Sequence, residues 1–170
     1  MSRVPVWFKR TFEFNFPVEQ YPNVCIRLRG TPARLEDLFR NCSREHLTTK
    51  LNGKWSAQEH AGHLLDLEPL WMARVDDYLN GGTVLTAADL SNSKTSNANH
   101  NSHPLEEIQA GFRKARFELV DHIEGLQPEL LGRSLVHPRL KKPMRLVDHL
   151  YFVAEHDDHH LGIIWELINR

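Results

Sequence analysis

Apolar side chains recur every three or four positions in four long segments of the chain. The clearest segment begins at Ser56, where Ser56 and Glu59 have the spacing of a capping box. It ends at Asn80-Gly81-Gly82, a sequence that stops helices. The pattern predicts a long helix with one inward face, which carries Ala57, Ala61, Leu64, Glu68, Trp71, Val75 and Tyr78.

Three other segments have the same period. One begins at Thr31-Pro32, a good N-cap followed by a residue suited to the first helical position, and ends near Cys42. The next begins at His103-Pro104 and ends at Gly125, and the last runs from about Met144 to Asn169. Together the four segments predict an all-α protein, a four-helix bundle.

The first 30 residues do not have this period. Phe12, Phe14 and Phe16 alternate with polar residues, which indicates an extended stretch that lays aromatic rings on an apolar surface. We therefore expect a single domain over residues 1–170, in which residues 1–30 form an N-terminal arm packed on the bundle.

Two connecting segments are polar. Residues 83–103 favour either a mobile surface loop or a lid that closes over a site. Residues 132–143 carry Arg133, Arg139, Lys141 and Lys142, which suit a solvated charge run or the attraction of an anionic substrate.

Composition excludes several classes of protein. Of 170 residues, 41% are hydrophobic and 25% charged, and Lys+Arg (21) nearly balances Asp+Glu (22). These values argue against a disordered chain, a membrane protein and a nucleic-acid-binding protein. Cys25 and Cys42 give no CxxC motif, and the apolar start breaks at Lys9-Arg10, too soon for a signal peptide. We expect reduced thiols and a cytoplasmic location.

Histidine is the unusual residue, with 11 copies. His156 and His160 lie one turn apart on the last helix, so both imidazoles can reach one ion. They flank the apolar stripe, His149 lies near the same edge, and His159 is expected to point away. The HxxxH spacing also arises by chance, so two ordinary polar residues are the alternative.

A third ligand has two candidates on the helix that begins after Ser56. His60 lies closer to the centre of the apolar face, and His63 lies on its shoulder. Periodicity slightly prefers His60 but does not decide between them.

Two motifs resemble a known family. Trp55-Ser56-Ala57-Gln58-Glu59-His60-Ala61-Gly62-His63-Leu64, followed by Glu68, resembles the W-S-x-x-E-x-x-x-H-L-x-x-x-E signature of the DinB-like, YfiT-like metal-binding four-helix proteins. His156-Asp157-Asp158-His159-His160-Leu161-Gly162 resembles the second signature of that family, H-x-x-x-H-x-G-Q-I. The resemblance covers the chain from about residue 31 onward.

The resemblance implies a function and a ligand set. It places one divalent ion per chain on His63, His156 and His160, and so favours His63 over His60. Zinc and nickel both suit imidazole ligands, and the ligand set does not choose between them. The glutamine of the second signature is Ile163 here. The family includes thiol transferases that use bacillithiol, mycothiol or glutathione, and metal-dependent hydrolases. A small-molecule substrate, a low-molecular-weight thiol and a homodimer are therefore expectations. The alternative is a non-catalytic stress-response protein that the ion stabilises.

Other polar residues of the inner faces are candidates for supporting roles. Glu68 would orient a ligand, act as a base, or pair with Arg113 or Arg116. Asp157 would serve the metal shell or bond the arm. His60 and His149 are candidates for proton transfer, with buried core histidines as the alternative. Asp66 is expected to face solvent.

Overall fold

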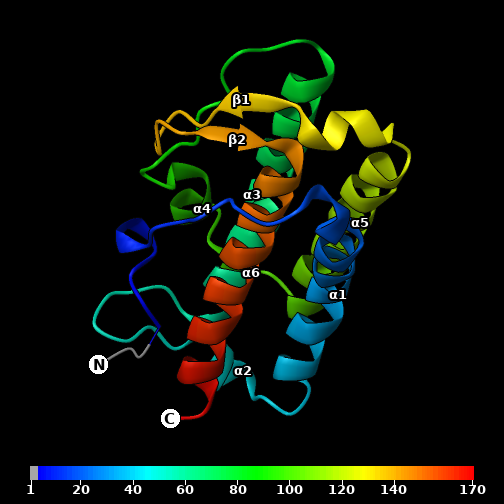
Figure 1. Cartoon of the computed structure of the whole chain (residues 1–170). Helices are drawn as coiled ribbons and strands as arrows, with labels where there is room; N and C mark the ends of the chain where they lie inside the picture. Colours follow the sequence, from blue (N-terminus) through cyan, green and yellow to red (C-terminus); the bar gives the residue numbers. More distant parts are fainter. Residues whose placement is uncertain (1–3) are drawn as a thin grey trace.

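The bundle is built from four long helices. The computed structural model describes residues 4–170, and its long helices are α1 (Tyr21–Phe39), α3 (Ala57–Leu79), α5 (Leu105–Glu124) and α6 (Leu146–Ile168). Helices α1 and α3 each pack against both α5 and α6, so the four stand at the corners of one bundle (Figure 1). The predicted all-α four-helix fold is confirmed.

Short elements connect the long helices. They include α2 (Arg44–Thr48), α4 (Ser93–Asn97) and the antiparallel strands β1 (Ser134–Val136) and β2 (Pro143–Arg145). The two strands form a hairpin at one end of the bundle, just before α6 begins (Figure 1). Four 3-10 turns complete the described chain: η1 (Trp7–Lys9), η2 (Val18–Gln20), η3 (His100–Ser102) and η4 (Pro128–Gly132).

Helix α3 begins as the capping box predicts. Ser56 Oγ accepts a hydrogen bond from the Glu59 backbone N–H at 3.1 Å, and Glu59 Oε2 accepts one from the Ser56 N–H at 2.8 Å. These two bonds satisfy amides that a helix start leaves without partners. The predicted ends of α5 and α6 also lie within about two residues of the observed ones.

Helix α1 begins ten residues earlier than Thr31-Pro32, so the predicted start was wrong. Pro32 lies inside the helix, where it has no N–H to donate to the Leu28 carbonyl one turn before it. Arg116 of α5 supplies that donor instead, with its Nη1 at 3.3 Å from the Leu28 oxygen. A tertiary contact therefore allows the helix to continue through a residue that would otherwise start or stop one.

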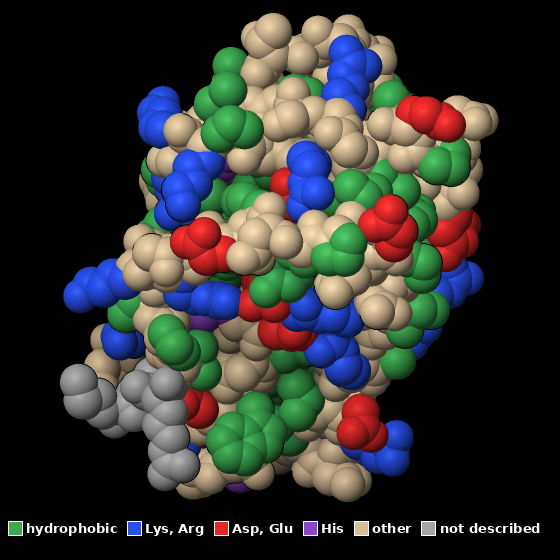
Figure 2. Space-filling model, in the orientation of Figure 1, with side chains coloured by type: hydrophobic (Ala, Val, Ile, Leu, Met, Phe, Trp, Pro, Cys, Tyr) green, Lys and Arg blue, Asp and Glu red, His purple; other side chains and the backbone are tan. Residues whose placement is uncertain are grey.

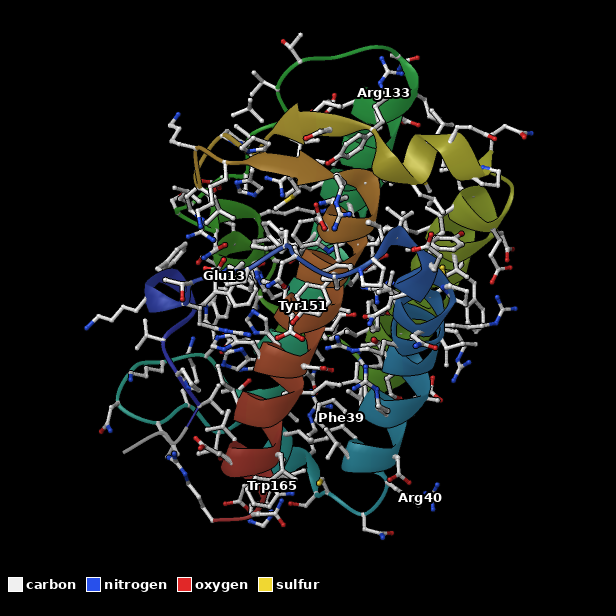
Figure 3. All side chains as sticks on the ribbon, viewed as in Figure 1. Glu13, Phe39, Arg40, Arg133, Tyr151 and Trp165 are labelled. Carbon is white, nitrogen blue, oxygen red and sulfur yellow. The ribbon has the colours of Figure 1, made fainter. Side chains whose placement is uncertain are left out.

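The N-terminal arm is extended and aromatic, as predicted, but it ends at Gln20 rather than at residue 30. It crosses the face of α6 in Figure 1. The Phe12 ring lies 5.0 Å from that of Phe152, and the Phe16 ring lies 5.1 Å from that of Tyr151, which Figure 3 labels. The arm thus covers one side of α6 with apolar surface.

No helix among residues 4–170 is both long enough and apolar enough to cross a lipid bilayer.

Candidate metal centre

Three histidines from two helices meet inside the bundle. His63 of α3 and His156 and His160 of α6 each offer a ring nitrogen, and these atoms all lie within 4.8 Å of one another. The two Nε2 atoms of His156 and His160 are 3.2 Å apart. Ligand nitrogens at about 2.0–2.1 Å from a tetrahedral zinc ion are themselves about 3.3 Å apart. The spacing of this three-histidine cluster therefore suits a single ion.

The protonation state of the three histidines suits the binding of a cation. Burial lowers the pKa of His63 to about 4, and burial and the neighbouring imidazoles lower those of His156 and His160 well below 6.5. All three rings are therefore neutral at pH 7, which is the form that binds metal ions. Neutral imidazoles suit zinc, nickel, copper or iron. The three residues therefore fit the divalent ion, zinc or nickel, that the sequence predicts.

His60 lies behind His160 rather than in the cluster. Its Nδ1 is 2.8 Å from Nδ1 of His160. In the tautomer that leaves Nε2 of His160 free for an ion, Nδ1 of His160 carries the hydrogen and donates it to His60. His60 can therefore fix the orientation of His160, whereas His63 occupies the position that the family signature indicates.

A second chain of hydrogen bonds orients His63. Nδ1 of His63 is 3.0 Å from the Thr95 hydroxyl of α4, which donates to Asp66 Oδ2 at 2.9 Å. Because Thr95 donates to the carboxylate, it accepts from Nδ1–H of His63, and Nε2 of that ring stays free. His100 Nε2 lies 2.8 Å from the same Asp66 oxygen.

Asp66 does not face solvent, so that expectation was wrong. Its side chain is 8% exposed, because α4 and η3 cover it. Although burial raises its pKa, hydrogen bonds from His100 and Thr95 hold the pKa below the usual aspartate value. Within the polar segment 83–103, α4 and η3 therefore pack on α3 beside the site, and Thr95 and His100 are buried there.

Gly62 makes room for this arrangement. A Cβ atom at Gly62 would lie 2.3 Å from the His100 ring, well inside contact distance. A glycine inside a helix lowers its stability by about 1 kcal/mol relative to alanine, so the presence of Gly62 in α3 indicates a close approach. This glycine was the signal in the sequence that could have located the contact between α3 and η3.

We predict that Thr95→Val lowers the affinity for the ion about 10- to 100-fold, because it removes the hydroxyl that holds Nδ1 of His63. Competition with a chelator of known affinity measures the effect. Thr49→Val is the matched control, since Thr49 is exposed and lies outside the site. Equal affinities in the two variants would contradict the role of Thr95.

Glu68 and Asp157 are joined to Arg116 instead of to the histidines. Arg116 of α5 is fully buried and donates to Glu68 Oε1 at 2.6 Å and, through Nη1, to Asp157 Oδ2. The Thr31 hydroxyl lies 2.8 Å from the same Asp157 oxygen. Among the described residues, neither carboxylate hydrogen-bonds the three-histidine cluster. Of the predicted alternatives, pairing of Glu68 with Arg116 is the one observed.

Asp157 does not hydrogen-bond the described part of the N-terminal arm, residues 4–20, because its partners are Thr31 and Arg116. Arg113 pairs with Glu36 on the outside of the bundle. His149 is a buried core histidine. Its ring lies 5.9 Å from that of Trp71, and it is not among the residues that line the cavity beside the cluster. The proposed catalytic roles of Glu68, Asp157 and His149 therefore lack supporting contacts.

The cluster opens into a cavity of about 660 Å³. The N-terminal arm, the segment before α4 and the hairpin loop border it, and Trp7, Trp71 and Phe152 supply much of its wall. Ile163, at the glutamine position of the second signature, makes the wall apolar there. His159 also lines the cavity, which corrects the expectation that it points away. Figure 2 shows only small patches of histidine surface on the face that the arm crosses.

We predict that the metal-free protein loses stability between pH 6.5 and about 4. The folded-state pKa values of His60 and His63 are lowered from 6.5 to about 3 and about 4, so in this window the unfolded chain binds more protons. Stability then falls as pH falls. Urea unfolding at about pH 7.5 and about pH 5 measures this loss of stability, and at both pH values most carboxylates stay ionised. A midpoint that does not change would contradict the prediction.

Known proteins share the four-helix fold of this chain. The chain is similar to YfiT from Bacillus subtilis, with a TM-score of 0.82, 20% identity, and coverage of 95% of this chain and 93% of that chain. YfiT is described as a probable metal-dependent hydrolase with an unusual four-helix bundle topology. No curated protein matches the chain significantly. The family model of the DinB superfamily matches residues 27–164, and the chain therefore belongs to that superfamily.

Proposed function

We propose that the protein is a metal-dependent hydrolase in which His63, His156 and His160 bind one divalent ion, zinc or nickel. The observation that carries the proposal is the meeting of three neutral, buried ring nitrogens on the wall of a cavity large enough for a small organic substrate. The description of YfiT supports hydrolysis as the class of reaction.

A bound divalent ion would act as a Lewis acid and lower the pKa of a water ligand towards about 7, and three protein ligands leave a position for such a ligand. The protein supplies the orientation. Thr95 holds His63, and His60 holds His160. The Trp7 and Trp71 rings lie 5.0 and 5.5 Å from that of His156 and pack against it, which restricts the orientation of this ring.

The proposal is tested with protein that has been loaded with zinc or nickel and offered small esters and amides. We expect turnover that requires the ion, rises through about pH 6–8 and is lost in His63→Ala. His46→Ala is the matched control, because His46 is exposed on α2. A structure of the His63→Ala variant, or its circular dichroism spectrum, establishes that the bundle still folds.

Two other results would replace this proposal. Turnover only with bacillithiol, glutathione or cysteine and an electrophile would identify a thiol transferase. Stabilisation by the ion without turnover of either panel would identify the non-catalytic protein of the alternative hypothesis.

A further inference from the structure

Part of the same cavity, towards the hairpin, is lined by two arginines and a histidine. Arg74 of α3 and His137 and Arg139 of the hairpin segment all line the cavity. Arg74 and His137 are each 2% exposed. Among residues 4–170, neither arginine pairs with a carboxylate, and Arg139 Nη2 is buried without a hydrogen-bond partner. A buried cation without a counter-ion is costly, so the arrangement calls for an explanation.

The hydrogen bonds of His137 show that its second ring nitrogen is a donor that faces Arg74. Its Nδ1 accepts from the backbone N–H groups of Arg139 at 3.2 Å and Leu140 at 3.1 Å. Burial and the two nearby arginines lower the pKa of His137 to about 3, so the ring is neutral and its hydrogen lies on Nε2. Nε2 is 3.3 Å from Nη1 of Arg74, which also carries hydrogens. Two donors therefore face each other, and an oxygen atom that accepts from both would satisfy them.

Among residues 4–170, the groups that neighbour these donors have no recorded hydrogen bond that supplies that oxygen. Arg74 Nε donates to the Thr86 carbonyl at 2.8 Å, which leaves its Nη2 and part of Nη1 for other acceptors. Asp89, a carboxylate on the cavity lining, accepts from the hydroxyls and backbone amides of Ser91 and Ser93. The donors of Arg74, His137 and Arg139, which we call the anion subsite, thus remain open to a ligand.

An apolar wall links the anion subsite to the histidine cluster. The Trp71 ring lies 5.5 Å from both the Arg74 guanidinium carbon and the His156 ring. The Phe152 ring lies 5.2 Å from that of His137. Arg74 follows His63 by three turns of α3, a rise of about 16 Å along the helix. A ligand that reaches both places therefore needs an apolar body of several carbon atoms between its ends.

We propose that Arg74, His137 and Arg139 bind the carboxylate or phosphate head group of an amphiphilic ligand whose apolar body lies along Trp71 and Phe152. The further idea that a bond of this ligand is hydrolysed at the histidine cluster rests on the proposed function. The head-group subsite itself does not, because its donors are defined without an ion.

Isothermal titration of metal-free protein, prepared with a chelator, tests the proposal with octanoate, octyl phosphate and the neutral octanamide. Removal of the ion prevents the head group from binding to the metal. We expect at least one anion to bind about tenfold or more tightly than octanamide, because charge-assisted hydrogen bonds are the stronger ones. The preferred anion shows whether the subsite suits carboxylate or phosphate.

Arg139→Gln should remove most of this preference, and because Arg139 is only half-buried its loss leaves the core intact. Arg74→Gln, at a buried position, should remove it wherever circular dichroism shows a folded protein. Arg40→Gln is the matched control, since Arg40 is exposed at the end of α1, away from the hairpin (Figure 3). It should retain the full preference.

Equal affinity for octanoate, octyl phosphate and octanamide would overturn the proposal, as would an unchanged preference in Arg139→Gln. Anion binding that appears only in metal-loaded protein would also overturn it, because the head group would then be a ligand of the ion. Failure of the hydrolase proposal is a separate result, since it appears as absent turnover while the anion preference of the metal-free protein persists.

Discussion

His160→Ala should abolish stoichiometric metal binding, whereas the unmodified chain should bind one ion. The substitution removes one of three ligand nitrogens, together with the contact through which His60 orients the ring. Elemental analysis of protein purified without a histidine tag or a nickel column measures the metal content. His46→Ala, at an exposed position on α2, should retain the ion. Full metal content in His160→Ala would exclude the cluster as the binding site.

The same site predicts a dependence of stability on metal. An ion that binds only the folded state adds RT ln(1 + [L]/Kd), about 4 kcal/mol at a thousandfold excess over Kd. The ligands come from α3 and α6, far apart in the sequence, so the unfolded chain does not hold them together. Chelation should lower the melting temperature of the unmodified chain but not of a His156→Ala/His160→Ala variant. An equal shift in both would show that the chelator acts elsewhere.

Arg116→Met should destabilise the bundle by about 3–5 kcal/mol, because it leaves the Glu68 and Asp157 carboxylates without their cation in the core. Burial already raises the pKa of Glu68 above the usual glutamate value. Without Arg116 this pKa should rise further, so the loss of stability should become smaller as the pH falls and the carboxylate takes up a proton. Urea unfolding at several pH values measures both effects.

Arg113→Met is the matched control on the same helix. Arg113 pairs with Glu36 through two hydrogen bonds, but both side chains are more than a third exposed, so we expect a loss of about 1 kcal/mol or less. Similar losses in the two variants would contradict the structural role of the buried network. Unchanged metal affinity in a folded Glu68→Gln variant would further separate this network from the metal centre.

The sequence by itself determined the main outline of the molecule. The capping box at Ser56 and the helical period define where α3 begins and which face it buries, because these are local properties of the backbone. The alternating aromatic residues of the arm likewise predicted that it packs on the bundle, and the structure places Phe12 and Phe16 against α6. The spacing of His156 and His160 predicted that both rings reach one place, since residues four apart share a helix face.

Only the tertiary structure decided which side chains gather around that place. Periodicity ranked His60 before His63 and directed Asp66 to solvent, because it describes one helix with a single buried side. Helix α3 is covered on another side by α4 and η3, from which Thr95 and His100 hydrogen-bond Asp66, and Thr95 also holds the ring of His63. The continuation of α1 through Pro32 likewise involves Arg116, which donates to the carbonyl that Pro32 leaves free. In both cases the deciding partner lies far along the chain, where a local pattern carries no information about it.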